Sequence, residues 1–252
     1  MTSKVTGLSL FLCVLVTLLT FLISSPATYW QPIVKQLTHD SIRLVNVTGS
    51  LMSGSGQIAY TVGPNRWQVL AERTNWHITP TLYGLRLSVE DNSHRLFVRP
   101  LTVLFTPQNI SIGEGESEFP ITLLQVFGGL TRTLKLSGQM RAIWHPVTLS
   151  LLTYQIKAPF DFEVTMNNLH SVVSPLPQLG SYKISGVLSQ LNGHFEVTTL
   201  TGPLHIEGQG VAVGRVIQFN GQAQADVGME DQLMGLLLLM GNMNGRVAHL
   251  HY

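Results

Sequence analysis

Hydrophobic and polar residues alternate with a period of two along most of the chain after residue 28. Leu85–Glu90, Leu134–Ser137 and Leu204–Glu207 alternate in this way, and Val216–Phe219 leads into Gln222–Val227 with the same pattern. Successive side chains of an extended strand point to opposite faces, so the pattern predicts strands with one buried and one wet face. Such strands are typical of antiparallel sheets, and we therefore predict a mainly β fold with an antiparallel β-rich domain.

Turn-forming residues interrupt these segments at intervals of roughly 8–12 residues, which is the spacing expected of a sandwich, an open trough or a partial barrel. The turns are expected at 63–65, 106–109, 202–203 and 220–221. Asn192-Gly193 predicts a two-residue hairpin turn between 187–191 and 195–200, because both residue types accept positive φ. All three arrangements share the period of two, so the pattern does not choose among them.

Two segments depart from the strand pattern and predict short helices. One is Tyr29–Thr38, and the other is Met229–Met240, which has acidic residues near its start and Gly241-Asn242 as a stop signal. The second helix is apolar all round at Leu236–Met240 but too short to cross a bilayer, so we expect it to be buried against the sheet. A closing strand follows at Arg246–Tyr252.

The most apolar segment lies at the start of the chain. Val5–Ile23 is hydrophobic, and no charged residue occurs between Lys4 and Lys35. A helix needs about 20 apolar residues to cross the hydrocarbon core, so we predict a membrane anchor within residues 1–28 and a β-rich domain over 29–252. Lys4 favours a cytoplasmic amino terminus. The side chains expected to carry the anchor are Leu8, Phe11, Leu15, Leu18, Phe21 and Ile23.

A cleaved signal peptide is the alternative interpretation of this segment. Ser25-Pro26-Ala27 resembles a small-residue cleavage site, although the apolar segment is longer than the usual region of about 7–15 residues. Either interpretation sends the rest of the chain across the membrane. The single cysteine, Cys13, lies within the segment, so the exported part has neither a disulfide nor a cysteine-based metal site.

Length and charge narrow the class of protein further. The 252 residues suffice for one large β domain or two small ones, and Ser174-Pro175-Leu176-Pro177 marks where two β halves would meet, near 174–178. Only 12% of residues are charged, which disfavours a helical protein with wet surface helices. The net charge of +1 and the scattered Lys and Arg residues give no electrostatic support for binding nucleic acid.

Candidate chemistry is sparse. The nine histidines include no HExxH motif, and His249 and His251 would share one strand face as part of a polar surface. No G-x-S-x-G elbow occurs, and the acids of Gly113–Glu118 lack the spacing of a calcium loop and suggest a solvated loop. We therefore expect no enzyme, no cofactor, no bound metal and no small-molecule substrate.

Two glycine-rich blocks support a resemblance to a family. Val47–Gly56 resembles the G-T-L-W-S-G signature of the protein N family of the bacterial type II secretion system (the general secretory pathway), with Ser50 in place of Thr and Met52 in place of Trp. The segment 177–210 and the apolar 233–242 are similar to the carboxy-terminal half of that family. The residues that carry the resemblance are Gly49, Leu51, Ser53, Gly54, Gly180, Tyr182, Gly202, Pro203 and Leu204.

The resemblance implies a single-pass inner-membrane protein of Gram-negative bacteria with a periplasmic β domain. Proteins of that family are accessory parts of the machine that moves folded proteins across the outer membrane, beside platform components C, L and M. No catalytic or cofactor-binding residue comes with the resemblance. The alternative function, suggested by long alternating strands next to an anchor, is a periplasmic β-trough that binds or transfers lipid.

Overall fold

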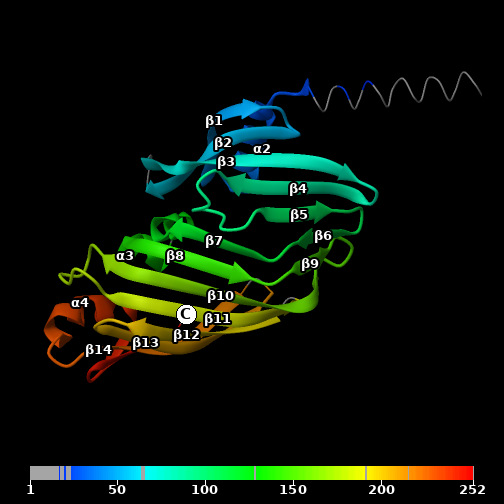
Figure 1. The fold of residues 1–252 in the computed structure, drawn as a ribbon. Helices are drawn as coiled ribbons and strands as arrows, with labels where there is room; N and C mark the ends of the chain where they lie inside the picture. The colour runs from blue at the N-terminus through cyan, green and yellow to red at the C-terminus, as the bar shows by residue number, and fades with distance from the viewer. Residues whose placement is uncertain are drawn as a thin grey trace, which may run out of the picture.

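The computed structural model describes residues 17, 20, 24–63, 66–127, 129–190, 192–214 and 216–251. Sixteen strands join in one antiparallel sheet, and the helices are few and short (Figure 1). The prediction of a mainly β, antiparallel domain with short helices is therefore confirmed. The six residues predicted to carry the anchor lie outside the described residues. Within the described part of the chain, no helix has the length and apolar character that a membrane span requires.

The strands follow one another along the chain with short connections. They are β1 Ile42–Gly49, β2 Ser53–Gly63, β3 Arg66–Thr81, β4 Gly84–Asp91, β5 Leu101–Phe105, β6 Asn109–Ile112, β7 Gly115–Pro120, β8 Leu136–Trp144, β9 Val147–Ser150, β10 Ile156–Ser171, β11 Gly180–Gln190, β12 Asn192–Thr201, β13 Leu204–Val213, β14 Val216–Ala225, β15 Asn242–Asn244 and β16 Val247–His251. The helices are η1 Ala27–Tyr29, α2 Trp30–Leu37, η2 Ile121–Phe127, α3 Gly129–Leu134 and α4 Glu230–Met240.

The sheet is a meander in which strands pair with their neighbours in sequence. β6 and β7 behave as one bent strand, and β8 and β9 behave as its bent partner. Ile112 pairs with Val147 before the bend and Gly115 pairs with Trp144 after it, so the register is the same on both sides. The bend includes Pro146, which has no N–H to donate to a ladder. Only the last strands depart from this order, because β16 lies between β14 and β15.

The helices η2, α3 and α4 contribute to the core on the apolar face of the sheet. Leu233, Leu236, Leu237 and Met240 of α4 are buried and join the main core cluster. The predicted burial of Leu236–Met240 is confirmed for one side of the helix only, because Leu238 and Leu239 are exposed. The helix predicted at 29–38 is also present as α2. No helix was predicted from the residue pattern at 121–134, yet η2 and α3 lie in this segment, and Ile121 is fully buried in the same core.

Two predicted turns are wrong for a common reason. Asn220-Gly221 lies inside β14, and Asn192-Gly193 opens β12, because the hairpin that precedes it turns two residues earlier. A Cβ on Gly193 would lie 2.2 Å from Leu188 Cδ2, and one on Gly221 would lie 2.8 Å from Phe219 Cζ. These glycines therefore leave room for large side chains beside them and do not turn the chain. The turn at 202–203, in contrast, is confirmed between β12 and β13.

Two further expectations are corrected. The acids of Gly113–Glu118 do not form a solvated loop, because Gly115–Pro120 is strand β7 and pairs with β8 along its length. Leu134 and Lys135 precede β8 and are not part of a strand: Leu134 ends α3, and Lys135 has a φ of 45°. The region 174–178, where two β halves would meet, lies in the connection from β10 to β11.

Candidate functional site

Polar side chains from successive strands form a continuous row on one face of the sheet. The register places Glu163 opposite Ser185, Ser185 opposite Glu196, Glu196 opposite Gln209, and Gln209 opposite Asn220. Side chains directly opposite each other on neighbouring strands lie on the same face and in contact range. A second polar row runs beside the first, from Glu207 through Gln222 to His249. The sheet from β10 to β16 therefore has one predominantly polar face.

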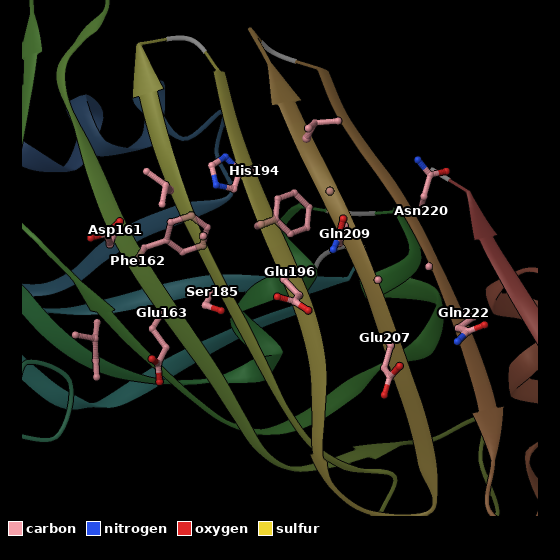
Figure 2. A pocket seen from close by; sticks show the side chains of 18 of the residues that line it. Asp161, Phe162, Glu163, Ser185, His194, Glu196, Glu207, Gln209, Asn220 and Gln222 are labelled. Atoms are coloured by element: carbon pink, nitrogen blue, oxygen red, sulfur yellow. The ribbon is translucent and has the colours of Figure 1, made fainter.

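This polar face is hollowed. It lines an open cavity of about 1130 Å³, whose floor comes from β8, β10 to β14 and β16 (Figure 2). Asp161, Glu163, His194, Glu196, Glu207 and Gln209 line the cavity. The volume is close to that of a large ligand pocket, but the opening is wide. The lining mixes these polar side chains with apolar residues such as Ile143, Phe162 and Val187.

The opposite face of the same strands is aromatic. Phe195 and Phe219 stack with parallel rings whose centroids are 6.1 Å apart. Gly210 lies between them in the sheet, and a Cβ there would be 2.0 Å from Phe195 Cζ. Glycine at this position therefore lets the two rings pack flat on the sheet. Phe162 and Phe195 are nevertheless among the residues that line the hollow.

The hollow carries negative charge. Glu163 forms an ion pair of 2.7 Å with Lys183, but Asp161, Glu196 and Glu207 form no ion pair with the described part of the chain. All three of these residues are exposed. Carboxylates in a concave surface reinforce each other's field and attract cations more strongly than they would on a flat surface. A partner for this surface should therefore present basic or hydrogen-bonding groups.

The two terminal histidines share one face, as their spacing predicts. The rings of His249 and His251 stack with centroids 6.5 Å apart, and His251 Nδ1 lies 2.8 Å from Asn220 Oδ1. Among the described residues, no three His, Cys, Asp or Glu side chains are placed to hold a metal ion. The pair therefore forms part of the polar surface described above.

The first block of signature residues forms the tight turn between β1 and β2. Gly49 pairs with Gly54, and a Cβ on Gly49 would lie 2.7 Å from Gly54 Cα, so the two strands approach too closely for larger residues. Gly49 also has a φ of 96°, which favours glycine. The Ser50 amide donates to the Ser53 carbonyl over 2.8 Å and closes the turn.

Leu51 at the tip of this turn joins three parts of the chain. Its carbonyl accepts hydrogen bonds from Trp30 Nε1 of α2, at 3.1 Å, and from Trp76 Nε1 of β3, at 3.2 Å. Its amide donates to the Ser25 carbonyl over 2.9 Å. The turn thus ties the segment that follows the predicted anchor to the edge of the sheet.

The second block forms a junction between the β10–β11 connection and the β12–β13 turn. Tyr182 is 1% exposed, and its hydroxyl lies 2.8 Å from the Leu204 carbonyl and 3.2 Å from the Leu179 carbonyl. A Cβ on Gly202 would lie 2.3 Å from Gly180 Cα, so the two turns are in direct contact. Burial raises the pKa of Tyr182 above its usual value. Pro203 completes the turn, and its carbonyl accepts the Asp226 amide over 2.8 Å.

The structure therefore brings the signature residues together in two groups, with β3 to β10 between them in the sheet. Both groups have structural roles, and neither lies in the hollow. Of the polar residues in the hollow, His249 alone was predicted to belong to a polar surface. The sequence feature that could have indicated the hollow is the occurrence of polar residues at alternate positions of consecutive strands, such as Glu196 and Glu207. No family model, curated protein or solved structure matches the chain.

Proposed function

We propose that the protein is a non-catalytic accessory component of a type II secretion machinery. In this proposal it is anchored in the bacterial inner membrane, with its sheet in the periplasm, and it assists the export of folded proteins across the outer membrane. The support is the resemblance of the two glycine-rich blocks to the protein N family. Their packing is consistent with it, because a scaffold that follows an anchor needs a firm junction such as the one at Leu51.

The hollow is the surface that we propose for contact with platform components. Asp161, Glu196 and Glu207, which form no ion pair with the described residues, suit a partner segment with Lys or Arg side chains. Electrostatic complementarity of this kind speeds association and selects the partner. The single observation that carries the choice of surface is the continuous polar row from Glu163 to Asn220.

The lining also bears on the alternative function as a lipid-binding trough. Transfer of an acyl chain from water to apolar surroundings is favourable. Removal of water from a carboxylate is unfavourable when the ligand provides no hydrogen-bonding or charged partner. Phe162 and Phe195 are among the residues that line the hollow, but Glu196 and Glu207 line it too and are exposed, so an acyl chain lying there would cover carboxylates. We therefore favour a protein partner over a lipid for this surface.

Crosslinking in cells tests the proposal. A photoreactive residue is placed in the hollow at Glu196 or Gln209 and, as matched exposed controls, at Leu82 or Val227, which are 89% and 90% exposed. We expect platform components to be captured from the hollow positions, and capture to fall at least tenfold when Glu207→Lys reverses a neighbouring charge. Capture of lipid alone, or equal capture of platform proteins at the control positions, would contradict the proposal.

A further inference from the structure

Helix α2 and its N-cap residue, Tyr29, present an exposed apolar stripe. Tyr29, Ile33 and Leu37 are 54%, 42% and 74% exposed, and they occur at intervals of four residues. Residues four apart lie on the same side of a helix, one turn after another. Lys35 lies about 200° around the helix from both Ile33 and Leu37, because it is two residues from each. The stripe can therefore enter an apolar medium without burying a charge.

The other side of α2 is attached to the sheet. Gln31 Nε2 donates to the Leu44 carbonyl over 3.0 Å, and Thr38 Oγ1 lies 3.0 Å from the Ile42 carbonyl. Trp30 donates to Leu51, as described above. The first two bonds use carbonyl groups on the outer edge of β1, the third uses the β1–β2 turn, and together they fix the rotation of the helix. The exposed stripe cannot turn inward without breaking them.

The position of α2 in the sequence limits how far it can lie from a membrane. Six peptide units separate Tyr29 from Ile23, the end of the predicted anchor. An extended chain spans at most about 3.6 Å per residue, so Tyr29 lies within roughly 22 Å of Ile23. A stripe of three side chains is also too small for a stable protein interface, which buries about 800 Å² on each partner.

We propose that the exposed face of α2, formed by Tyr29, Ile33 and Leu37, lies in the lipid interface and sets the orientation of the sheet relative to the bilayer. An amphipathic helix of this kind places its apolar side chains at the boundary between headgroups and acyl chains, where tyrosine is also favoured. This inference rests on the membrane anchor of the proposed function, but it does not require a secretion partner.

Fluorescence quenching of the full-length chain in phosphatidylethanolamine–phosphatidylglycerol vesicles tests this inference. In the chain of wild-type sequence, an environment-sensitive dye is attached to the only thiol, Cys13, and reports on the anchor. In a Cys13→Ser background, the dye is placed at Ile33→Cys or Leu37→Cys, with Leu82→Cys as the exposed control. Quenchers are attached to the lipid acyl chains at a shallow and a deep position. Circular dichroism of each variant checks that its strand content is unchanged.

We expect the dye at positions 33 and 37 to shift its emission to the blue and to be quenched at least twofold more by the shallow quencher than the dye at position 82. Quenching at Cys13 without quenching at 33 and 37 would overturn the inference while leaving the anchor in place. Crosslinking of position 37 between two copies, with no lipid quenching there, would overturn it in favour of a dimer. Partner capture from the hollow is measured separately, so failure of the secretion proposal is distinguishable.

Discussion

Replacement of Tyr182 by phenylalanine should destabilise the protein while preserving its shape. The hydroxyl is buried and lies 2.8 Å from the Leu204 carbonyl. Phenylalanine keeps the ring but leaves this buried carbonyl without its donor, which costs about 1–3 kcal/mol. With a urea dependence of about 2 kcal/mol per molar, a loss of about 2 kcal/mol lowers the unfolding midpoint by about 1 M. Tryptophan fluorescence of the full-length chain in detergent micelles measures the midpoint.

The same variant predicts a change in the alkaline pH dependence of stability. Burial raises the pKa of Tyr182 in the folded protein, whereas in the unfolded chain it is about 10. The contribution of the neutral hydroxyl to the free energy of unfolding is therefore fully present below pH 10. Above pH 10, this contribution falls by up to about 1.4 kcal/mol per pH unit. Tyr182→Phe has no such group, so the stability difference between wild type and variant should shrink between pH 10 and 11.

Tyr154 provides the matched control for this prediction. Its side chain is 72% exposed, so Tyr154→Phe should change the unfolding free energy by less than about 0.5 kcal/mol. A midpoint for Tyr182→Phe equal to that of Tyr154→Phe would show that the buried hydroxyl contributes nothing. A wild-type minus variant difference that stays constant from pH 9 to 11 would refute the argument from the pKa.

Three further changes test other parts of the fold. Asp91 is 1% exposed and accepts hydrogen bonds from two backbone amides and one hydroxyl. Burial raises the pKa of Asp91, but the hydrogen bonds have the larger combined effect and hold this pKa below its ordinary value. Its contribution is therefore present above about pH 4 and lost at lower pH, so Asp91→Asn should weaken the acid dependence in unfolding curves from pH 2 to 6. Gly210→Ala forces the Phe195 ring to move and should cost about 1–3 kcal/mol in urea unfolding, partly restored by Phe195→Leu; an unchanged midpoint would contradict the packing argument. Trp30→Phe removes one of two donors to the Leu51 carbonyl and should cost about 0.5–1.5 kcal/mol, with faster amide exchange at Leu51 as the local measure.

The alternation of residue types predicted the strands well where one face is wet, as in β4 and β13. It failed at 121–134, where Gly128-Gly129 and several β-branched residues disfavour a helix locally. Tertiary packing forms the helix there: Ile121 is fully buried, and Thr122 Oγ1 lies 2.6 Å from Tyr60 Oη of β2. Local propensity does not contain this information.

The hollow could not be predicted because it depends on register across several hairpins. Glu196 meets Gln209 only because the β12–β13 turn falls at 202–203, and Ser185 meets Glu196 only because the preceding turn falls two residues before Asn192-Gly193. A shift of one residue in either hairpin would move these side chains to the other face. The Asn-Gly dipeptides indicated turns from local chemistry, while their glycines serve the packing of Leu188 and Phe219.

The order of the strands also protects the protein from polymerisation. A meander presents an open edge at each end, and an unpaired edge can template the addition of another chain. At the first end, α2 covers β1 through Gln31 and Thr38. At the last, the chain doubles back so that β16 lies inside and the three-residue β15 lies outside. Such a short strand offers few backbone groups to a newcomer. The longer open edge at this end of the described sheet is the start of β14, Val216–Phe219, which β16 does not reach.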